Sequence, residues 1–351
     1  MNVTTIGLDI AKNVFFAHGV DEHGKAVMQK KLSRGQVLAY FAKRPPCLVG
    51  IEATGGAHYW ARELNRLGHT AKLMPAQYVK PYVKRDKNDP NDAAGICEAV
   101  SRPSMRFVGL NTVAQQDVQM LHAIRRRLVG SRTALTNQIR GLLGEYGLVF
   151  GQGPTRVRRG LTETLAEDDA RLSVAARELV ADVQQQLTEL ENRLTDYNAR
   201  IERVCAADAR CVKLDVLPGV GPITATALVA AVNDGKQYKR GRHMSSSLGL
   251  TPREHSSGGK QHLLGISKRG NTYVRTLLIH GARSVLQHAA QKPDPDPLIR
   301  WALAVQARRG KNIAAVALAN KLARIAWALL AQERTYDPRW TKPRGVNAIP
   351  V

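Results

Sequence analysis

The first hundred residues carry an apolar pattern that predicts five strands and four helices in a fixed order. Three segments rich in β-branched and aromatic residues come first, separated by short turns, at residues 3–9, 14–20 and 25–32. Helices and strands then alternate: a helix at 34–43, a strand at 47–52, a helix at 58–68, a strand at 70–74, and helices at 77–83 and from residue 90 onward. The strand at 47–52 is continuously apolar, which indicates burial on both faces.

Three strands in a meander followed by helix–strand crossovers is the element order of the ribonuclease H-like fold. We therefore expect an N-terminal α/β domain over residues 1–105, built on a mixed sheet of that kind. Beyond it the apolar pattern has a helical period, so the rest of the chain is expected to be all-α.

Two long helices are expected in the middle region, residues 106–210. One spans 113–147 and has an arginine-rich face, and a break over 150–160 separates it from a second helix at 172–204. In the second helix apolar residues recur at spacings of three and four: Leu179, Val183, Leu187, Leu190, Leu194, Tyr197 and Ile201. This seam fits two interpretations equally, an antiparallel helical hairpin packed on itself or a coiled coil that joins subunits.

A third, mostly helical domain is expected over residues 211–335. Its first segment holds a glycine-rich turn, residues 218–221, between two helical stretches. This is the form of a helix-hairpin-helix, in which backbone N–H groups at Gly219 and Gly221 can bind a DNA phosphate, although such a turn also joins ordinary helices. The remaining elements are a Ser/Gly-rich loop at 243–259, helices at 271–289 and 312–332, and an irregular tail at 336–351.

The charge balance narrows the class of partner. The chain has 351 residues with 52 Lys+Arg against 29 Asp+Glu, a formal net charge of +23 that is typical of nucleic-acid-binding proteins. From residue 235 to the end there are 21 Lys/Arg and five acids, so most of the excess lies in the last third. A metal-binding module followed by a nucleic-acid-binding module fits this asymmetry.

Cysteine and hydropathy patterns argue against other classes. The four cysteines form no CxxC pair, so no zinc site is predicted, and Cys47 and Cys97 are expected to be buried thiols. There is neither a signal peptide nor an apolar stretch long enough to span a bilayer. We therefore expect a cytoplasmic, nucleoid-associated protein without a membrane partner.

Four carboxylates are the strongest chemical signal in a chain this basic: Asp9, Glu52, Asp89 and Asp92. The first two end apolar strands, and the last two lie three residues apart at the start of a helix. Each alone fits a turn or helix-cap residue, but together they predict a site for Mg²⁺ (or Mn²⁺) of the type that cuts phosphodiester bonds. Flanking cations either steer a phosphate to this site or form a solvated face: Lys12, Lys84, Arg85 and Lys87.

A serine in the last third of the chain is the candidate nucleophile. Ser257 precedes Gly258 and Gly259, which let the backbone approach a ligand closely. A serine that attacks a phosphate needs nearby positive charge to hold the phosphate and to stabilise the transition state. Such cations surround it in sequence: His255, His262, and four predicted nucleic-acid contacts, Arg253, Lys260, Lys268 and Arg269.

Five segments occur in an order that is similar to a known family: GLDIAK at 7–12, GIEATGG at 50–56, KNDPNDA at 87–93, LPGVG at 217–221 and GLTPREHSSGG at 249–259. On these motifs the chain resembles, over nearly its whole length, the transposases of insertion-sequence family 110, in its 1111 branch. These are related to the Piv-type DNA invertases. One position departs from the family pattern, since Asn88 stands where the family usually has Thr.

The resemblance implies a RuvC-like domain in which the four acids form a DEDD set that binds Mg²⁺. It implies that Ser257, by its register from the GLTP segment, is the nucleophile rather than the adjacent Ser256. It further implies action on donor and target DNA, guidance by a structured non-coding (bridge) RNA from the element, and a homo-oligomer, dimer or tetramer, on a DNA synapse.

Three hypotheses about function follow. The leading one is a recombinase that cuts and rejoins DNA strands through Ser257 and a divalent metal. The second is a junction-resolving, RuvC-like endonuclease in which the metal activates water and no serine is needed. The third is a non-enzymatic protein that packages RNA or DNA by charge alone. A covalent protein–DNA species separates the first from the second, and full function of an Asp9→Asn variant would support the third.

Overall fold

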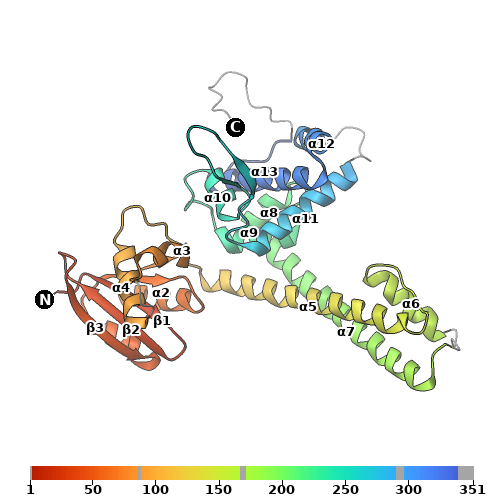
Figure 1. Ribbon diagram of the computed structural model, residues 1–351, viewed down its shortest axis with the longest axis horizontal. Coiled ribbons are helices and arrows are strands. Elements are labelled where there is room, and N and C mark those ends of the chain that lie inside the picture. Colours follow the sequence, from red (N-terminus) through yellow and green to blue (C-terminus); the bar gives the residue numbers. More distant parts are fainter. Residues whose placement is uncertain (1, 85–87, 167–170, 290–295, 339–351) are drawn as a thin grey trace. The chain divides into compact units, whose positions relative to one another are not determined.

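The computed structural model describes residues 2–84, 88–166, 171–289 and 296–338, and it divides into two compact units, residues 1–112 and 113–351 (Figure 1). Each unit has its own hydrophobic core. The expected division into three domains, with boundaries at 105 and 210, remains a prediction.

A five-stranded mixed sheet forms the centre of the first unit. Its strands lie in the order β3-β2-β1-β4-β5. The first three form an antiparallel meander, and β4 and β5 run parallel to β1. The bounds are β1 Thr5–Ile10, β2 Val14–Val20, β3 Ala26–Ser33, β4 Leu48–Glu52 and β5 Thr70–Met74. The predicted meander and mixed sheet are therefore confirmed.

Helices cover both faces of this sheet. Their bounds are α1 Val37–Ala42, α2 Ala57–Arg66, α3 Ala76–Val79 and α4 Asp89–Val100, with short 3₁₀ turns at Arg34–Gln36 and Lys80–Tyr82. One face packs Ile6, Leu8 and Ile51 against α1 and α2, and the other lies under α4. Cys47 and Cys97 are buried as predicted, and burial raises the pKa of each thiol to about 11.

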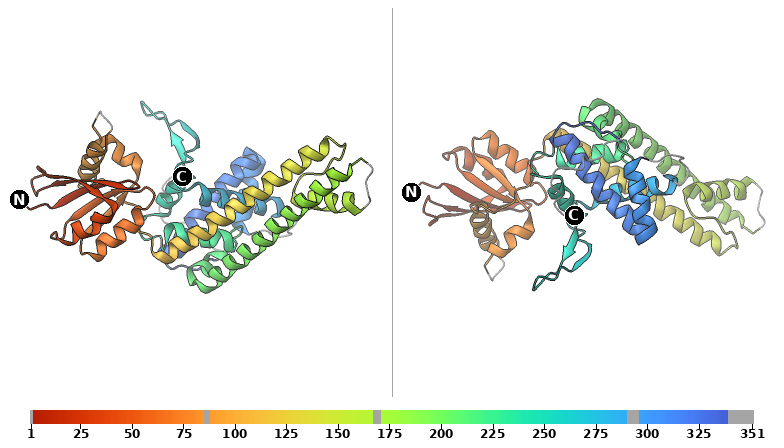
Figure 2. Two further views of the ribbon diagram at one scale, coloured as in Figure 1. Left: turned by 90° about the horizontal axis from the view of Figure 1, so that it is seen from below. Right: turned by 90° about the horizontal axis from the view of Figure 1, so that it is seen from above.

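Two long helices in the second unit, α5 Val113–Gly144 and α7 Val174–Ala207, lie side by side (Figure 2). They run antiparallel, because Arg125 early in α5 donates a hydrogen bond to Asn198 late in α7, while Ile139 and Val180 share one core at the opposite ends. The α7 residues buried at heptad spacing are Val180, Leu187, Leu194 and Ile201. Leu179, which was expected in the seam, is 68% exposed. The seam is thus buried within one chain, and its role in joining subunits remains a prediction.

One further helix corrects the sequence analysis of this region. The expected break over 150–160 is wrong beyond its first four residues, because α6 runs Pro154–Ala166. Proline suits the first turn of a helix, and Val157 and Leu161 are buried one turn apart. The helix therefore packs an apolar stripe into the core shared by α5 and α7.

The remaining helices surround a second core in this unit. Their bounds are α8 Ala209–Asp215, α9 Pro222–Val232, α10 Gly241–Ser247, α11 Thr272–Ala289, α12 Pro297–Arg309 and α13 Lys311–Ala331. The loop expected at 243–259 is wrong at its start, where α10 places Ser245 in the core at 0% exposure. It is also wrong at 252–254, where strand β6 pairs with β7 Leu263–Ile266. Helix α12 was not predicted, although Asp296 caps it and Pro297 opens it.

Helix α13 has the length and composition of a membrane-spanning helix, so the expectation that no such stretch exists is wrong by that test. Packing accounts for the composition. Leu318, Leu322 and Leu329 lie in the core of the second unit, and α10, α11 and α12 all pack on α13. A central core helix is apolar on most of its surface, and α13 fits this description.

Candidate active site

Helix α4 approaches the sheet closely because two glycines lie beneath it. Gly7 of β1 and Gly50 of β4 are paired neighbours in the sheet. A Cβ built on Gly7 would lie 2.1 Å from the carbonyl oxygen of Ala93, and one on Gly50 would lie 2.7 Å from Cβ of Val100. Both positions therefore face α4, and at position 7 only glycine lets the helix backbone lie so near the strand.

The start of α4 is fixed by Asn88. Its side chain accepts a hydrogen bond from the backbone N–H of Asn91 at 2.9 Å, and Pro90 stands in the first turn. The helix begins at Asp89, so its first turn contains both Asp89 and Asp92. Asn and Thr both serve as N-caps. Asn88 can therefore start the helix at the same place as the Thr that the family usually has.

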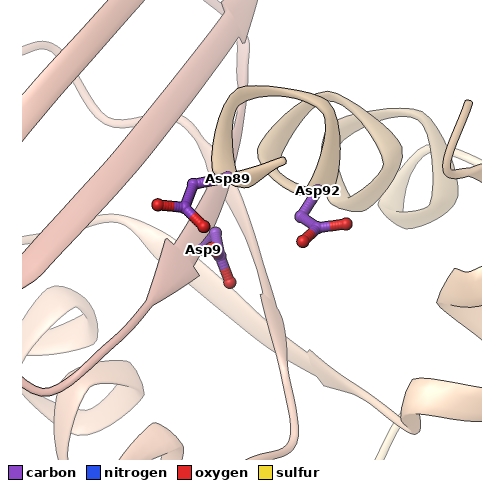
Figure 3. A group of neighbouring side chains, drawn as sticks. All are labelled: Asp9, Asp89 and Asp92. Atoms are coloured by element: carbon purple, nitrogen blue, oxygen red, sulfur yellow. The ribbon is translucent and has the colours of Figure 1, made fainter. Parts of the chain in front are cut away.

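Asp9 joins these two acids from the end of β1. Side chains alternate along a strand, so Asp9 lies on the same face as Gly7, toward α4. Asp9, Asp89 and Asp92 point toward one another (Figure 3), and one carboxylate oxygen from each lies within 4.8 Å of the other two. Asp9 and Asp92 are half-buried and Asp89 is exposed. Carboxylates this close repel one another, and a cation between them offsets that repulsion.

The three acids fit a hard divalent cation. Mg²⁺ and Mn²⁺ prefer carboxylate oxygens as ligands, and two ligands on opposite sides of Mg²⁺ lie about 4.2 Å apart. The oxygens therefore need only small side-chain rotations to meet at one ion. No other group of three acids, histidines or cysteines this close is found in the described residues.

Glu52 lies outside this group of three, although the sequence predicted four ligands together. It ends β4, one residue beyond the paired residues Leu8 and Ile51. Because side chains alternate along a strand, Glu52 and Gly50 lie on the same face of the sheet, the face that α4 covers. Glu52 is there next to Asp9 on the adjacent strand. Glu52 thus ends its strand as predicted, while its half-buried carboxylate is not within the 4.8 Å that joins the other three.

Two of the four predicted flanking cations can be described. Lys12 and Lys84 are exposed, whereas Arg85 and Lys87 lie outside the described residues. Lys84 acts on His18 of β2: burial lowers the pKa of His18, and the positive charge of Lys84 lowers it further. Positive charge therefore lies near the strand that neighbours Asp9.

Ser257 lies at the tip of the β6–β7 hairpin. The backbone N–H of Lys260 donates to the carbonyl of Ser257 at 3.0 Å, and Gly258 and Gly259 between them have φ of +56° and +75°. Two left-handed residues make the tight turn that joins antiparallel strands, so these glycines are required by the backbone. Ser257 is exposed.

The two adjacent serines differ in their hydrogen bonding. The hydroxyl of Ser256 donates to Glu254 at 2.6 Å and accepts from the backbone N–H of His262 at 3.2 Å. The side chain of Ser257 makes no hydrogen bond within the described residues. Ser256 is therefore held in the hairpin structure, and the Ser257 hydroxyl is available to a ligand.

Two side chains that the sequence analysis missed fasten the stem of this hairpin. Arg275 of α11 is 7% exposed and donates to the carbonyls of Leu248 and Arg269, each at 2.9 Å. Asn320 of α13 donates to the carbonyl of Leu250 at 2.9 Å. Position 275 follows the buried period of α11, so an arginine on an apolar face was the available signal.

The predicted nucleic-acid contacts near the hairpin are all exposed cations: Arg253, Lys260, Lys268 and Arg269. The two glycines of the 218–221 turn differ from each other. A Cβ on Gly219 would lie 2.6 Å from the carbonyl oxygen of Gly281, so this glycine serves close packing on α11. Gly221 precedes α9, is exposed, and has open space around it.

Two protein-family models match the chain. The model described as "Transposase IS116/IS110/IS902 family" matches residues 211–295, which include the serine hairpin. A second model, described as "Transposase" and named for a DEDD transposase of the IS110 type, matches residues 6–148, which include the three clustered acids.

Similar proteins are found over nearly the whole length. A probable family 20 transposase of Pseudomonas aeruginosa is 50% identical, covering 96% of this chain and 100% of that protein. The transposase for insertion sequence element IS1111A of Coxiella burnetii is 46% identical, covering 95% of this chain and 92% of that protein. The pilin gene-inverting protein of Moraxella bovis is 23% identical, covering 97% and 99%. The chain therefore belongs to the IS116/IS110/IS902 family of insertion-sequence transposases, enzymes that cut DNA and transfer its strands.

Proposed function

We propose that the chain moves an insertion sequence by cutting and rejoining DNA with two sets of groups. Asp9, Glu52, Asp89 and Asp92 hold Mg²⁺ (or Mn²⁺), and Ser257 is the nucleophile. The observation that carries the proposal is the convergence of three carboxylates from β1 and α4 within 4.8 Å. When bound, the cation supplies positive charge to a scissile phosphate.

The serine chemistry follows from the groups on the hairpin. The Ser257 oxygen attacks phosphorus and loses its proton, while the bond from phosphorus to one deoxyribose oxygen breaks and that oxygen gains a proton. The phosphoserine ester keeps the bond energy, so a hydroxyl of another strand can displace the serine and rejoin the DNA. Cations beside the hairpin offset charge on the phosphate, with Arg253 and Lys260 nearest in sequence.

Hydrogen bonding supports Ser257 over Ser256. The Ser256 hydroxyl is engaged with Glu254 and His262, so its attack on phosphorus would first break both contacts. Glu52 supports the metal site through its register, since it ends the strand beside Asp9 on the same face of the sheet. We propose that Glu52 turns toward the other three acids when the cation binds.

The wider assignment rests on the element order and on charge. The meander followed by parallel strands supports a ribonuclease H-like, RuvC-like unit. The net charge of +23 supports binding to nucleic acid, and we propose from the family resemblance that a structured guide RNA is bound besides the DNA. Exposed Gly221 at the start of α9 and the cations Lys268 and Arg269 are the proposed phosphate contacts of the second unit. We further propose that the protein acts as a dimer or tetramer.

The nucleophile is tested by trapping the covalent intermediate. Wild-type protein incubated with guide RNA, Mg²⁺ and donor DNA is expected to form an adduct that survives denaturing electrophoresis, and peptide mass spectrometry should map it to Ser257. Ser256→Ala is the matched control and keeps the adduct, whereas Ser257→Ala loses it. An adduct retained by Ser257→Ala would refute the assignment, and cleavage without any adduct would favour the junction-nuclease alternative.

The metal site is tested by calorimetric titration with Mn²⁺, which needs no DNA. Asp9→Asn is expected to lower the affinity at least tenfold, because it removes one of three clustered carboxylates. Asp117→Asn, in α5, is the control for the loss of one negative charge elsewhere. Equal Mn²⁺ affinity of Asp9→Asn and wild type would refute the metal site.

A further inference from the structure

A pocket opens beside the acid group, between the first turn of α4 and strands β2 and β3 of the sheet. It is lined from α4 by Pro90 and Ala93, which flank Asp92 in sequence, and from β2 and β3 by Phe16, His18 and Lys31. Helix α4 packs on β1, β2 and β4, whereas β3 is the edge strand. The pocket and the acids thus share one helix turn and one face of the sheet.

Strand register arranges four side chains in a row across this face. Asp9 pairs with Phe16, and Phe16 pairs with Lys31, so all three point to the same side. Glu52 extends the row on the other flank of Asp9. Two strand spacings, about 10 Å, separate Asp9 from Lys31. The row reads carboxylate, carboxylate, aromatic ring, ammonium from β4 to the sheet edge.

The groups in the pocket suit an anion that carries a flat ring. Phe16 is half-buried, and the Lys31 ammonium lies 5.9 Å from its ring centroid. His18, in the next row, has a buried Nδ1 without a hydrogen-bond partner among the described residues, which costs free energy until a ligand satisfies it. Because side chains alternate along a strand, the side chain of Lys30 points to the opposite face, and no acid is among the lining residues. Lys84 adds positive charge near His18.

We infer that this pocket binds the nucleotide next to the scissile phosphate on the DNA strand, with its base on Phe16, a base atom hydrogen-bonded to His18 Nδ1, and its phosphate at Lys31. The inference rests on the proposed function, because the strand would reach the pocket only if a cation bound by the acids held the scissile phosphate. Stacking on an aromatic ring tolerates any base, whereas His18 adds a preference for bases that present a hydrogen-bonding atom at that depth.

The test measures binding of a fluorescein-labelled single-stranded DNA oligonucleotide to the full-length protein in Ca²⁺, which occupies a carboxylate site without requiring turnover. Phe16→Leu is expected to weaken binding about tenfold through the loss of stacking. Lys31→Gln should reduce the slope of log affinity against log salt by about 0.7, the value for one phosphate contact on a single strand. Lys31 is exposed, so this second variant keeps the fold if Phe16→Leu does not.

The first unit offers a matched control pair. Lys72 lies 4.7 Å from the ring centroid of Phe107, which is 39% exposed and does not line the pocket. Phe107→Leu and Lys72→Gln should leave affinity and salt slope as in wild type. Equal effects of the two pairs, or no effect of either, would overturn the inference, as would a dependence seen only with an RNA oligonucleotide of the same sequence.

A cross-linking measurement gives the position of the base. An oligonucleotide with 5-iodouracil beside the scissile phosphate is expected to cross-link to the peptide that contains Phe16 and His18, and Phe16→Leu should abolish that cross-link. Cross-linking only to other peptides would overturn the inference. Neither measurement needs strand cleavage. If wild-type protein formed no Ser257 adduct but Phe16→Leu still weakened DNA binding, the proposed chemistry would be refuted and the pocket assignment would stand.

Discussion

Replacing Gly7 by alanine should separate the acids of the metal site without touching any of them. The new Cβ would lie 2.1 Å from the carbonyl oxygen of Ala93 and 2.3 Å from the backbone nitrogen of Cys97. Both are helix backbone atoms that cannot rotate away. Ordinary contact needs more than 3 Å, so α4 must move off the sheet by roughly 1 Å, carrying Asp89 and Asp92 with it.

Gly7→Ala is expected to lower both the folding stability and the strand-cleavage rate. Overpacking of this kind costs about 1–3 kcal/mol of folding stability, and backbone overlap places Gly7→Ala at the upper end. Metal ligands need placement within about 0.5 Å, so a shift of this size should lower the strand-cleavage rate about a hundredfold. Urea denaturation measures the first effect, and Mn²⁺ calorimetry with a cleavage assay measures the second.

Two other glycines serve as controls. Gly35, where a Cβ would meet nothing within 4 Å, should accept alanine with a stability change below about 1 kcal/mol. Gly50→Ala meets the side chain of Val100 at the far end of α4, so it should destabilise the unit while changing Mn²⁺ affinity less than Gly7→Ala does. Wild-type Mn²⁺ affinity in a destabilised Gly7→Ala protein would refute the claim that helix approach sets the acid geometry.

Three further predictions concern stability. Arg275→Met should cost about 2–4 kcal/mol in urea denaturation, because the buried carbonyl of Leu248 and the part-buried carbonyl of Arg269 lose their donor; a cost below 1 kcal/mol would contradict the fastening role. His122 bonds Tyr273 and Thr226 at 3.0 Å each, and burial followed by the charge of Arg125 lowers its pKa to about 4. Between pH 6.5 and 4, His122 is therefore protonated in the unfolded chain but neutral in the folded chain. The free energy of unfolding should fall by about 3 kcal/mol as the pH drops over this range. His122→Gln should remove this part of the pH profile, and an unchanged profile would contradict the assignment. Asn88→Ala should cost about 1 kcal/mol through loss of the helix cap, whereas Asn88→Thr should not, and both are measured by thermal unfolding.

The order of strands and helices along the first unit could be predicted from the sequence because each strand has its own period and turn. The strand-end positions of Asp9 and Glu52 followed from that order. The distance between Asp9 and α4 did not, because it depends on which residue of β1 lies under the helix. Gly7 was visible only as one letter of a motif, and its packing role needed coordinates. For the same reason Glu52 was expected to be equivalent to Asp9, although its carboxylate lies outside the group of three.

Two errors in the second unit have a common cause: loops were predicted from residue composition where the spacing of buried residues indicates a helix. Glycine and arginine at 151–160 suggested a break, but Val157 and Leu161 carry a helical stripe. Serines at 245–247 suggested a loop, but small residues pack well in a core, and Ser245 is fully buried. An arginine on the apolar face of α11 was the one signal for the hairpin stem, but its partners are backbone carbonyls, at Leu248 and Arg269, which only the coordinates identify.

The acids of α4 taken alone do not require a metal. Asp89 and Asp92 lie in a first turn, where the helix dipole favours negative charge, and Asn88 caps the same turn. Asp9 is different, because it ends a strand and brings a third charge against the other two. Gly7 adds a second cost, since glycine weakens a strand interior by about 1 kcal/mol relative to alanine. In a strand with no helix backbone this close, folding stability would favour a larger residue at position 7, and at position 9 it would favour an uncharged residue. Glycine at position 7 and aspartate at position 9 together bring three carboxylates around one point. A bound cation offsets the free-energy cost of both residues.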